Sequence, residues 1–344
     1  MKTPGLPFRF YLAAYRFASW LIVHTGPIGP IVIKLGGRVQ HNFVPRSYSA
    51  PNPVYIDGLS IYHAEQPLVA RWLAMGLYEA ETTRVLRESV KPGMTVLDVG
   101  ANIGYFSLMA ARFTGENGRV WAFEPVPTML EILNLNVRNN ALQNIITVIP
   151  QAVSNVPGTT AMYVNAMASG WSSLYGEASA TLPPEIRAQQ ERIEIGCITL
   201  DDWAAQHKWP TVDLIKMDIE GAEKQALEGM IQLSRKNARL KLIIEFNIRT
   251  LQAAAITPEE LFVAIHACGF DNISIIADKL QPLDIPIDVS QLLREIHEGN
   301  GESVNLFCEK CKGQQHVAQA PDESYADRPT ASDADATISQ CIDA

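Results

Sequence analysis

Residues 96–104 (VLDVGANIG) carry the strongest chemical signal in the chain. An apolar strand is expected there, with Asp98 near its end, followed by Gly100, Asn102 and Gly104 before a predicted helix. Gly100 lets the backbone turn tightly, and Gly104 lets the helix begin close to a ligand. A strand, a glycine turn and a helix in this order predict a nucleotide-type ligand at the carboxyl end of the strand.

The spacing of the glycines separates two kinds of ligand. Dinucleotide sites use G-x-G-x-x-G, in which the middle glycine lets the pyrophosphate approach the helix N-terminus. Asn102 stands at that middle position, and no third glycine follows at the required spacing. The acid-x-Gly-x-x-x-Gly pattern suits a ligand that lacks phosphate and has a charged amino-acid end, namely S-adenosylmethionine. We expect Asp98, Gly100, Asn102 and Gly104 to bind this cofactor, with a nicotinamide-dependent oxidoreductase as the alternative.

Glu124 ends the second predicted strand, in residues 120–125 (VWAFEP). A carboxylate at this position accepts hydrogen bonds from both hydroxyls of a ribose, in a bidentate geometry that a neutral side chain matches less well. Sites for NAD use the same device, so Glu124 alone does not separate the two cofactors. Its distance from the glycine turn predicts that it binds a cofactor.

Several runs of residues together resemble one protein family. Residues 93–110 are similar to the first motif of class I S-adenosylmethionine-dependent methyltransferases, a motif that the whole class shares. Residues 76–82 (GLYEAET), 199–203 (TLDDW) and 214–223 (LIKMDIEGAE) resemble the FkbM family in particular, and the last run is the more specific motif. The resemblance extends from about Tyr78 to Cys308. It implies a methyltransferase, commonly of sugar or polyketide hydroxyls.

The fold that the resemblance implies is α/β and Rossmann-like, with seven strands in the order 3-2-1-4-5-7-6. The hydrophobic pattern agrees, because short apolar runs alternate with helical stretches, which is typical of a mostly parallel sheet with helices on both faces. We expect strands at 95–99, 119–124, 145–149, 212–217, 240–246, 272–276 and 303–308. We expect helices within 68–90 and at 105–113, 128–139, 222–233 and 258–268.

Two acids at the end of the fourth strand of this fold are the candidate catalytic residues. In an open α/β sheet, ligands lie beyond the carboxyl ends of the strands at the switch in strand order, which places Asp218 beside the methyl-bearing sulfonium. Alternation along an extended chain puts Glu220 on the same side. Either acid accepts the proton of an acceptor hydroxyl, or both hold a divalent cation such as Mg²⁺ together with Glu245. Alternatively, Glu220 and Glu223 only stabilise the N-terminus of the following helix, where negative charge is favoured.

Lys216, inside an apolar strand, needs a carboxylate partner, and we expect its role to be structural.

Residues 151–211 interrupt the alternation of strands and helices. We expect a hairpin around 156–158 (VPG), followed by an insertion that carries substrate contacts or a lid. Residues 171–173 (WSS) resemble a short segment that lies near the acceptor in the FkbM family, although a pair of serines in a loop is usually only solvated. The chain therefore divides into a basic and apolar extension at 1–60, a methyltransferase domain at 61–311 and a disordered acidic tail at 312–344.

The charge of the chain is acidic but unevenly placed. The 28 lysines and arginines against 37 acids give a net charge of −9, which excludes sequence-independent nucleic-acid binding as a leading function. Residues 1–50 nevertheless hold six basic residues and no acid. Residues 8–23 have an apolar stripe at helical spacing, interrupted by Arg9 and Arg16, and this run is too short and too charged to span a bilayer. The predicted helix either lies in a membrane interface or packs on the protein itself.

The five cysteines are too few and too scattered for a disulfide framework, which indicates a reducing compartment, the cytoplasm. We expect Cys308 and Cys311, a single C-x-x-C, to be free thiols because no second pair exists.

The expected function is S-adenosylmethionine-dependent O-methylation of a hydroxyl on a saccharide, glycolipid or related metabolite. A non-catalytic protein that binds the same cofactor is the other alternative. The expected partner is a small-molecule or glycan acceptor, with membrane contact through 8–23 at the inner face left open.

Overall fold

The computed structural model describes residues 52–63, 67–76, 78–165, 174, 190–284, 287, 289, 292, 293, 296 and 303–311. The chain divides into two compact units, residues 1–311 and 312–344, and all described residues belong to the first unit. The helix predicted at 8–23, the segment 171–173 and the tail predicted to be disordered at 312–344 lie outside the described residues. Within the described part of the chain, no helix has the length and apolar character needed to cross a membrane.

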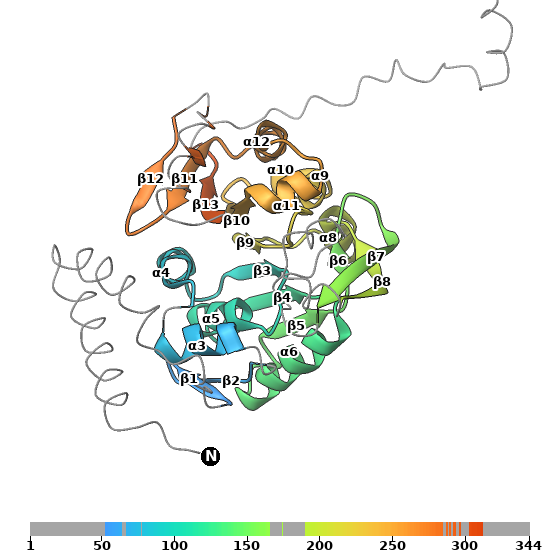
Figure 1. Ribbon diagram of the computed structural model, residues 1–344. Coiled ribbons are helices and arrows are strands. Elements are labelled where there is room, and N and C mark those ends of the chain that lie inside the picture. The colour runs from blue at the N-terminus through green and yellow to red at the C-terminus, as the bar shows by residue number, and fades with distance from the viewer. Residues whose placement is uncertain are drawn as a thin grey trace, which may run out of the picture. The chain divides into compact units, whose positions relative to one another are not determined.

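A central sheet of eight strands forms the core of the fold (Figure 1). Its strands are β3 (Thr95–Val99), β4 (Arg119–Phe123), β5 (Ile146–Ile149), β9 (Leu214–Met217), β10 (Lys241–Asn247), β11 (Asn272–Ile276), β12 (Leu280–Pro282) and β13 (Ser303–Glu309). Their order in space is β5-β4-β3-β9-β10-β13-β11-β12. The strands from β5 to β10 are parallel, and β13 runs antiparallel to both β10 and β11.

This arrangement confirms the predicted strand order 3-2-1-4-5-7-6 and adds one strand. The additional strand, β12, pairs antiparallel with β11 and forms the edge of the sheet. The central strands are buried on both faces, as parallel strands usually are, and all four residues of β9 are buried. The switch in strand order lies between β3 and β9, which is where a ligand site is expected.

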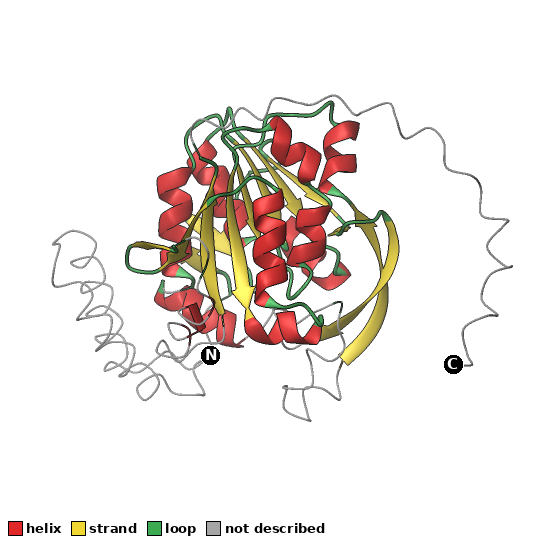
Figure 2. Ribbon diagram, turned by 90° about the horizontal axis from the view of Figure 1, so that it is seen from above, coloured by secondary structure: helices red, strands yellow, loops and turns green. Residues whose placement is uncertain are grey.

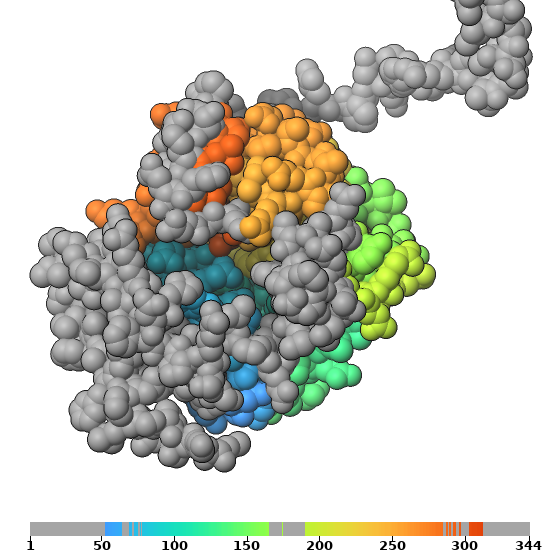
Figure 3. Space-filling view, in the orientation of Figure 1, coloured from blue at the N-terminus to red at the C-terminus, as the bar shows by residue number. Residues whose placement is uncertain are grey.

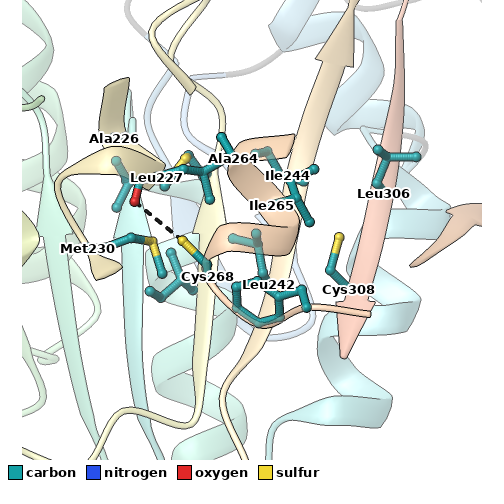
Figure 4. Packing of buried hydrophobic residues seen from close by; sticks show 14 of the residues in the cluster. Ala226, Leu227, Met230, Leu242, Ile244, Ala264, Ile265, Cys268, Leu306 and Cys308 are labelled. Atoms are coloured by element: carbon teal, nitrogen blue, oxygen red, sulfur yellow. Dashed lines mark hydrogen bonds between the residues drawn. The ribbon is translucent and has the colours of Figure 1, made fainter. Parts of the chain in front are cut away.

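Helices cover both faces of the sheet, as predicted (Figure 2). One hydrophobic cluster includes residues of α3 (Pro67–Met75), α4 (Ala80–Ser89), α5 (Tyr105–Thr114) and α6 (Pro127–Asn139). The other includes residues of α8 (Leu200–Gln206), α9 (Glu223–Glu228), α10 (Ile231–Lys236), α11 (Ile248–Ala253) and α12 (Pro258–Ala267). Figure 4 shows part of the second cluster, where the thiol of Cys268 donates a hydrogen bond to the carbonyl oxygen of Leu227 (3.3 Å). Cys308, buried in β13, and exposed Cys311 are free thiols, as expected.

The helix expected over 222–233 is divided into α9 and α10. The division falls at Gly229 and Met230, where a β-carbon on Gly229 would collide with the backbone of Ser154. The second piece begins under the carboxylate of Asp201, which accepts hydrogen bonds from the amides of Gln232 (3.0 Å) and Leu233 (2.7 Å). Close contact with a distant loop therefore divides a segment whose apolar pattern is continuous.

The insertion contributes a second small sheet, formed by β6 (Ala152–Val153), β7 (Gly158–Asn165) and β8 (Gln190–Ile198). The hairpin predicted around 156–158 is wrong in its pairing. These residues do connect β6 to β7, but β8 lies between the two strands, parallel to β6 and antiparallel to β7. The true antiparallel pair, β7 with β8, is closed by the segment between residues 165 and 190.

A hairpin of β1 (Val54–Ile56) and β2 (Leu59–Ile61) precedes α3. Its turn, Asp57 and Gly58, has φ values of 49° and 80°, as a two-residue hairpin turn requires. The side chain of Asn136 on α6 accepts from the amide of Tyr62 (2.7 Å) and donates to its carbonyl oxygen (3.0 Å). Val54 and Leu59 join the core, so this hairpin crosses the domain boundary expected at residue 61.

Candidate active site

A cavity of about 230 Å³ lies at the carboxyl ends of β3, β4, β9 and β10. The loops that follow β3, β4 and β9 line it together with Glu245 of β10. Tyr78 and Glu79, which precede α4, and residues of the insertion complete the lining. Figure 3 shows the face on which the teal surface of the earlier elements meets the orange surface of the later ones. The cavity therefore stands at the switch point where the fold predicts a ligand.

Gly100 is required by the close approach of two loops. Its φ is +84°, and a β-carbon there would collide with the carbonyl oxygen of Asp218. The amides of Gly100 and Ala101 both donate to the carbonyl oxygen of Phe123 (3.0 and 2.9 Å). The tight turn predicted at Gly100 is present, and it brings the loop after β3 against the loop after β9.

Gly104 is not among the residues that line the cavity, and the structure gives a further reason for glycine at this position. Its φ is +90°, and a β-carbon there would collide with the side chain of Leu133 on α6. The glycine thus lets the start of α5 pack closely on Leu133 of α6.

Glu124 and Asn102 both line the cavity, and a hydrogen bond joins them. The carboxylate of Glu124 accepts from the amide of Asn102 (2.8 Å) with one oxygen and from the amide of Val126 (2.8 Å) with the other. Asn102 adopts the left-handed conformation, with a φ of 52°. Burial raises the pKa of Glu124 to about 7 in spite of these hydrogen bonds. Each oxygen keeps a second lone pair, so Glu124 can still accept from the hydroxyls of a ribose.

Asp98 lies beneath the cavity and is not among its lining residues. It is 1% exposed, and its Oδ2 accepts a hydrogen bond from the hydroxyl of Ser107 (2.5 Å). Its Oδ1 has no hydrogen-bond partner among the described residues. Burial raises its pKa, and the ammonium of Lys216 opposes that change. The structure therefore gives Asp98 a place under the site, where it faces a buried lysine.

Lys216 is the buried cation of the site, and it also lines the cavity. Its Nζ lies 3.0 Å from Oδ2 of Asp218 and 4.8 Å from the ring centroid of Phe106. Burial alone would lower the pKa of Lys216, but the carboxylates of Asp218, Asp98 and Glu79 outweigh it and raise the pKa. The predicted carboxylate partner of Lys216 is therefore present. Lys216 also lines the cavity, a location that the expected structural role did not include.

The structure brings Asp218, Glu220 and Glu245 together. One carboxylate oxygen from each lies within 4.8 Å of those of the other two. Asp218 directly follows β9, and Glu245 lies near the end of β10, as predicted. Glu220 reaches the site differently, because β9 ends at Met217 and Glu220 has a left-handed φ of 53° in a turn. Strand alternation was thus the wrong reason for a correct grouping.

The loop that carries Asp218 and Glu220 is held by Glu223. One oxygen of the Glu223 carboxylate accepts from the amide of Ile219 and the other from the amide of Gly221, both at 2.9 Å. Glu223 is 2% exposed, so this support is internal to the fold. The suggestion that Glu223 serves the start of its helix is close to what the structure shows, with the preceding loop as the actual partner.

The clustering of acids raises their pKa values. Burial raises the pKa of Glu220 well above its usual value, and the neighbouring charges of Glu245 and Asp218 raise it further. Burial likewise raises the pKa of Glu245, and the charges of Asp218 and Glu223 add to the effect. The site is therefore one in which a proton or another cation is readily held.

Glu79 and Tyr78 line the cavity although no role was predicted for either. Burial raises the pKa of Glu79 to about 7, which the ammonium of Lys216 partly offsets. Both residues belong to residues 76–82, a run that carried the family resemblance. That run was the signal available in the sequence, but it precedes the first strand, and no spacing rule connects it to the strand ends.

A doubly wound sheet in this strand order, with a glycine loop after its first strand and a cavity at the switch point, defines a class I methyltransferase fold. Residues 98–271 match the Methyltransferase FkbM domain, and the chain belongs to this family of methyltransferases.

Several known proteins are similar to the chain. Methyltransferase sdnD of Sordaria araneosa is 23% identical over 244 residues, which cover 65% of this chain and 90% of the relative. The 31-O-demethyl-FK506 methyltransferase FkbM of Streptomyces tacrolimicus is 27% identical over 161 residues, which cover 41% of this chain and 61% of that enzyme. The solved structure of methyltransferase FkbM from Methylobacillus flagellatus KT is 16% identical, with a TM-score of 0.34, and the match covers 82% of this chain and 60% of that one.

Membership of this family implies S-adenosylmethionine as the methyl donor, and the residues of the cavity fit it. Glu124 presents a buried carboxylate at the end of β4, next to the apolar side chains of Val126 and Met129. Five carboxylates and, among the described lining residues, one ammonium line the cavity. A donor with a sulfonium and an ammonium group offsets this excess of negative charge.

Proposed function

We propose that the enzyme methylates a hydroxyl oxygen of a saccharide, a glycolipid or a related metabolite. The observation that carries this proposal is the gathering of Asp218, Glu220 and Glu245 beside the glycine loop. A hydroxyl is a weak nucleophile, so its methylation gains from a carboxylate that accepts the proton as the new bond forms.

The residues divide into binding and chemical roles in this proposal. S-adenosylmethionine supplies a methyl group on a positively charged sulfur. Glu124 accepts hydrogen bonds from the ribose hydroxyls, and the loop at Gly100 and Asn102 supports the donor. Asp218 accepts the proton of the acceptor hydroxyl, assisted by Glu220. Holding both reactants in one cavity supplies much of the acceleration, since positioning alone contributes about 7–11 kcal/mol in favourable cases.

The three carboxylates also have the oxygen atoms that a divalent cation such as Mg²⁺ prefers. The position of Lys216 argues against a metal, because its ammonium already lies 3.0 Å from one oxygen of Asp218. The ammonium thereby neutralises part of the negative charge that would attract a metal ion. The proposal therefore assigns Asp218 to proton transfer, and sensitivity to chelators tests the metal alternative.

The name of one relative supports oxygen as the accepting atom. The Streptomyces tacrolimicus enzyme is named for 31-O-demethyl-FK506, a compound described by an oxygen that lacks its methyl group. The chain matches 61% of that enzyme, so this support concerns the type of atom and leaves the identity of the acceptor to experiment.

The proposal is tested with methyl-labelled S-adenosylmethionine and a fractionated cell extract. We expect label to enter a saccharide, glycolipid or small-metabolite fraction in a form that resists mild base, as an ether does. Label that enters only protein or nucleic acid would overturn the proposed acceptor class. Titration calorimetry tests the donor. If the protein binds NADH and does not bind S-adenosylmethionine, the oxidoreductase alternative is favoured instead.

We also propose that residues 8–23 contact an anionic membrane surface. Their apolar stripe is accompanied by Arg9 and Arg16, within a stretch of 50 residues that has six basic side chains and no acid. The proposed location is the cytoplasm, at the inner face of the membrane, where a glycolipid acceptor would be within reach.

A further inference from the structure

Glu79 is a cavity residue that the roles above do not use. It precedes α4 with φ 42° and ψ 53°, a left-handed conformation that side chains other than glycine rarely adopt. Its side chain makes no capping hydrogen bond to the helix and lines the cavity instead. Such a conformation costs about 1–3 kcal/mol and persists where the surrounding structure holds it, often at ligand sites.

Asn305, far from Glu79 in the sequence, donates a hydrogen bond to the Glu79 carboxylate. The side-chain amide of Asn305 donates to Oε2 of Glu79 (3.1 Å) and approaches Oγ1 of Thr82 (3.0 Å). Asn305 stands on β13 directly across from Glu245 on β10, so the last strand connects two acids of the site. An amide orients a carboxylate without cancelling its charge, which leaves Glu79 able to bind a cation.

Lys216 lines the same cavity as Glu79, and the two charges interact. Its ammonium is close enough to lower the pKa of the Glu79 carboxyl, against the larger effect of burial. A carboxylate next to an ammonium is the charge pattern complementary to an α-amino acid, whose ammonium and carboxylate are also adjacent. The donor carries an end of this kind.

We propose that Glu79, positioned by Asn305, binds the α-ammonium group of the donor's amino-acid end. The inference depends on the proposed function only in that S-adenosylmethionine is the donor. Glu79 is then a ligand-binding residue, and Asn305 is a positioning residue that acts through it.

Three ligands separate the parts of the donor in titration calorimetry. S-adenosylmethionine has the amino-acid end and the sulfonium charge, S-adenosylhomocysteine has only the amino-acid end, and 5′-methylthioadenosine has neither. We expect Glu79→Gln to weaken binding of the first two by similar factors of about 10–100, the usual effect of losing a charged hydrogen-bond partner. Binding of 5′-methylthioadenosine should change by less than about twofold, which also shows that the variant is folded.

Asn305→Leu tests the positioning role. It should weaken the same two ligands by a smaller factor than Glu79→Gln, and it should cause little further loss in a Glu79→Gln background, because the two residues act as a unit. Asn305→Ser serves the same purpose if the leucine variant fails to fold. Glu81→Gln is the matched control, since it removes the same charge from the first turn of the same helix outside the cavity lining.

The outcomes distinguish this inference from the function on which it rests. Equal losses for all three ligands would show that Glu79 is structural only, and a loss for S-adenosylmethionine alone would assign Glu79 to the sulfonium. Either result, or unchanged binding, overturns the inference while the methyltransferase function stands. A wild-type protein that binds none of the three ligands overturns the inference together with its donor.

Discussion

Individual carboxylates in the cavity and in the loops around it differ in which groups they already accept hydrogen bonds from. Both oxygens of Glu124 accept backbone hydrogen bonds, and so do both oxygens of Glu223. Asp218 faces an ammonium, and Glu79 faces an amide. Carboxylates satisfied by backbone amides hold the loops in place. Asp218 and Glu79, which are held by side chains, are suited to contact reactants, and Glu124 keeps a second lone pair on each oxygen for the ribose hydroxyls.

Asp218→Asn is the most direct test of proton transfer. The substitution keeps the shape of the side chain and removes its charge, so turnover should fall by roughly 10²–10⁴-fold, the usual contribution of a general base. Affinity for S-adenosylmethionine should change far less, because other residues hold the ribose and the amino-acid end. Turnover is measured with labelled donor, and affinity by calorimetry.

Glu220→Gln belongs to the same test. If the two acids act together, the double variant should be little worse than Asp218→Asn alone, since residues that act as a unit are not additive. Near-normal turnover in a folded Asp218→Asn enzyme would remove Asp218 from the chemistry. Loss of turnover with a chelator, restored by Mg²⁺, would favour the metal alternative instead.

The elements that carry these residues are joined and packed at glycines with positive φ. Gly104 allows α5 to pack on Leu133 of α6, and its φ is +90°. Gly93 has a similar φ of +85°, but no atom lies within 4 Å of the place a β-carbon would take. Substitution of Gly93 therefore tests backbone strain alone, and substitution of Gly104 tests backbone strain together with a collision.

Gly93→Ala should lower the free energy of unfolding by about 1–2 kcal/mol, the cost of the left-handed conformation. Gly104→Ala should lower it by a larger amount. Leu133→Ala removes the colliding side chain, so the Gly104→Ala/Leu133→Ala variant should be less destabilised than the sum of the two single variants by at least about 1 kcal/mol. Denaturant titration measures all four proteins. Strict additivity would show that Leu133 does not set the requirement for glycine.

Elements were largely predictable from the sequence where one local pattern decides them. The bounds of β3 and β11 match the predicted ranges because each is a short apolar run between turn residues. The break at Gly229 was not predictable, because it depends on the approach of Ser154 from the insertion. The order of β6, β8 and β7 likewise depends on long-range pairing.

Within the site, strand ends predicted the positions of Asp218, Glu245 and Glu124, since topology alone brings such ends to one edge of the sheet. Glu79 could not be placed in this way. It reaches the cavity from a segment before the first strand, through a left-handed turn and a hydrogen bond from Asn305. Neither feature leaves a periodic signal in the sequence.

The whole chain combines a net charge of −9 with a basic first stretch, residues 1–50. If residues 8–23 bind an anionic membrane, the full-length protein should sediment with liposomes that contain phosphatidylserine at low salt. Binding should weaken as salt rises, because charge interactions are screened over about 10 Å at 0.1 M salt. Replacing Arg9 and Arg16 by glutamine should reduce binding and leave donor affinity unchanged. Absence of wild-type binding at low salt would favour a helix packed on the protein.

The buried acids give the ligand-free protein a distinctive dependence of stability on pH. Burial raises the pKa values of Glu79, Glu124 and Glu223 from 4.5 to about 7. Between these values the folded protein binds more protons than the unfolded chain, so the free energy of unfolding falls as pH rises. The contribution of these acids is fully present below 4.5 and is lost once the pH has passed about 7.

The Tm of the ligand-free protein should therefore be several degrees higher near pH ~5.5 than near pH ~8, if each acid contributes on the order of 1–3 kcal/mol. Glu124→Gln cannot titrate, so this variant should show a smaller fall in Tm over the same range. Glu260→Gln is the matched control. The pKa of Glu260 is lowered by the amide of Thr257, which confines its effect to pH values below 4.5. Differential scanning calorimetry measures the slopes, and a Tm that does not fall between the two pH values would show that these buried acids stay ionised in the folded protein.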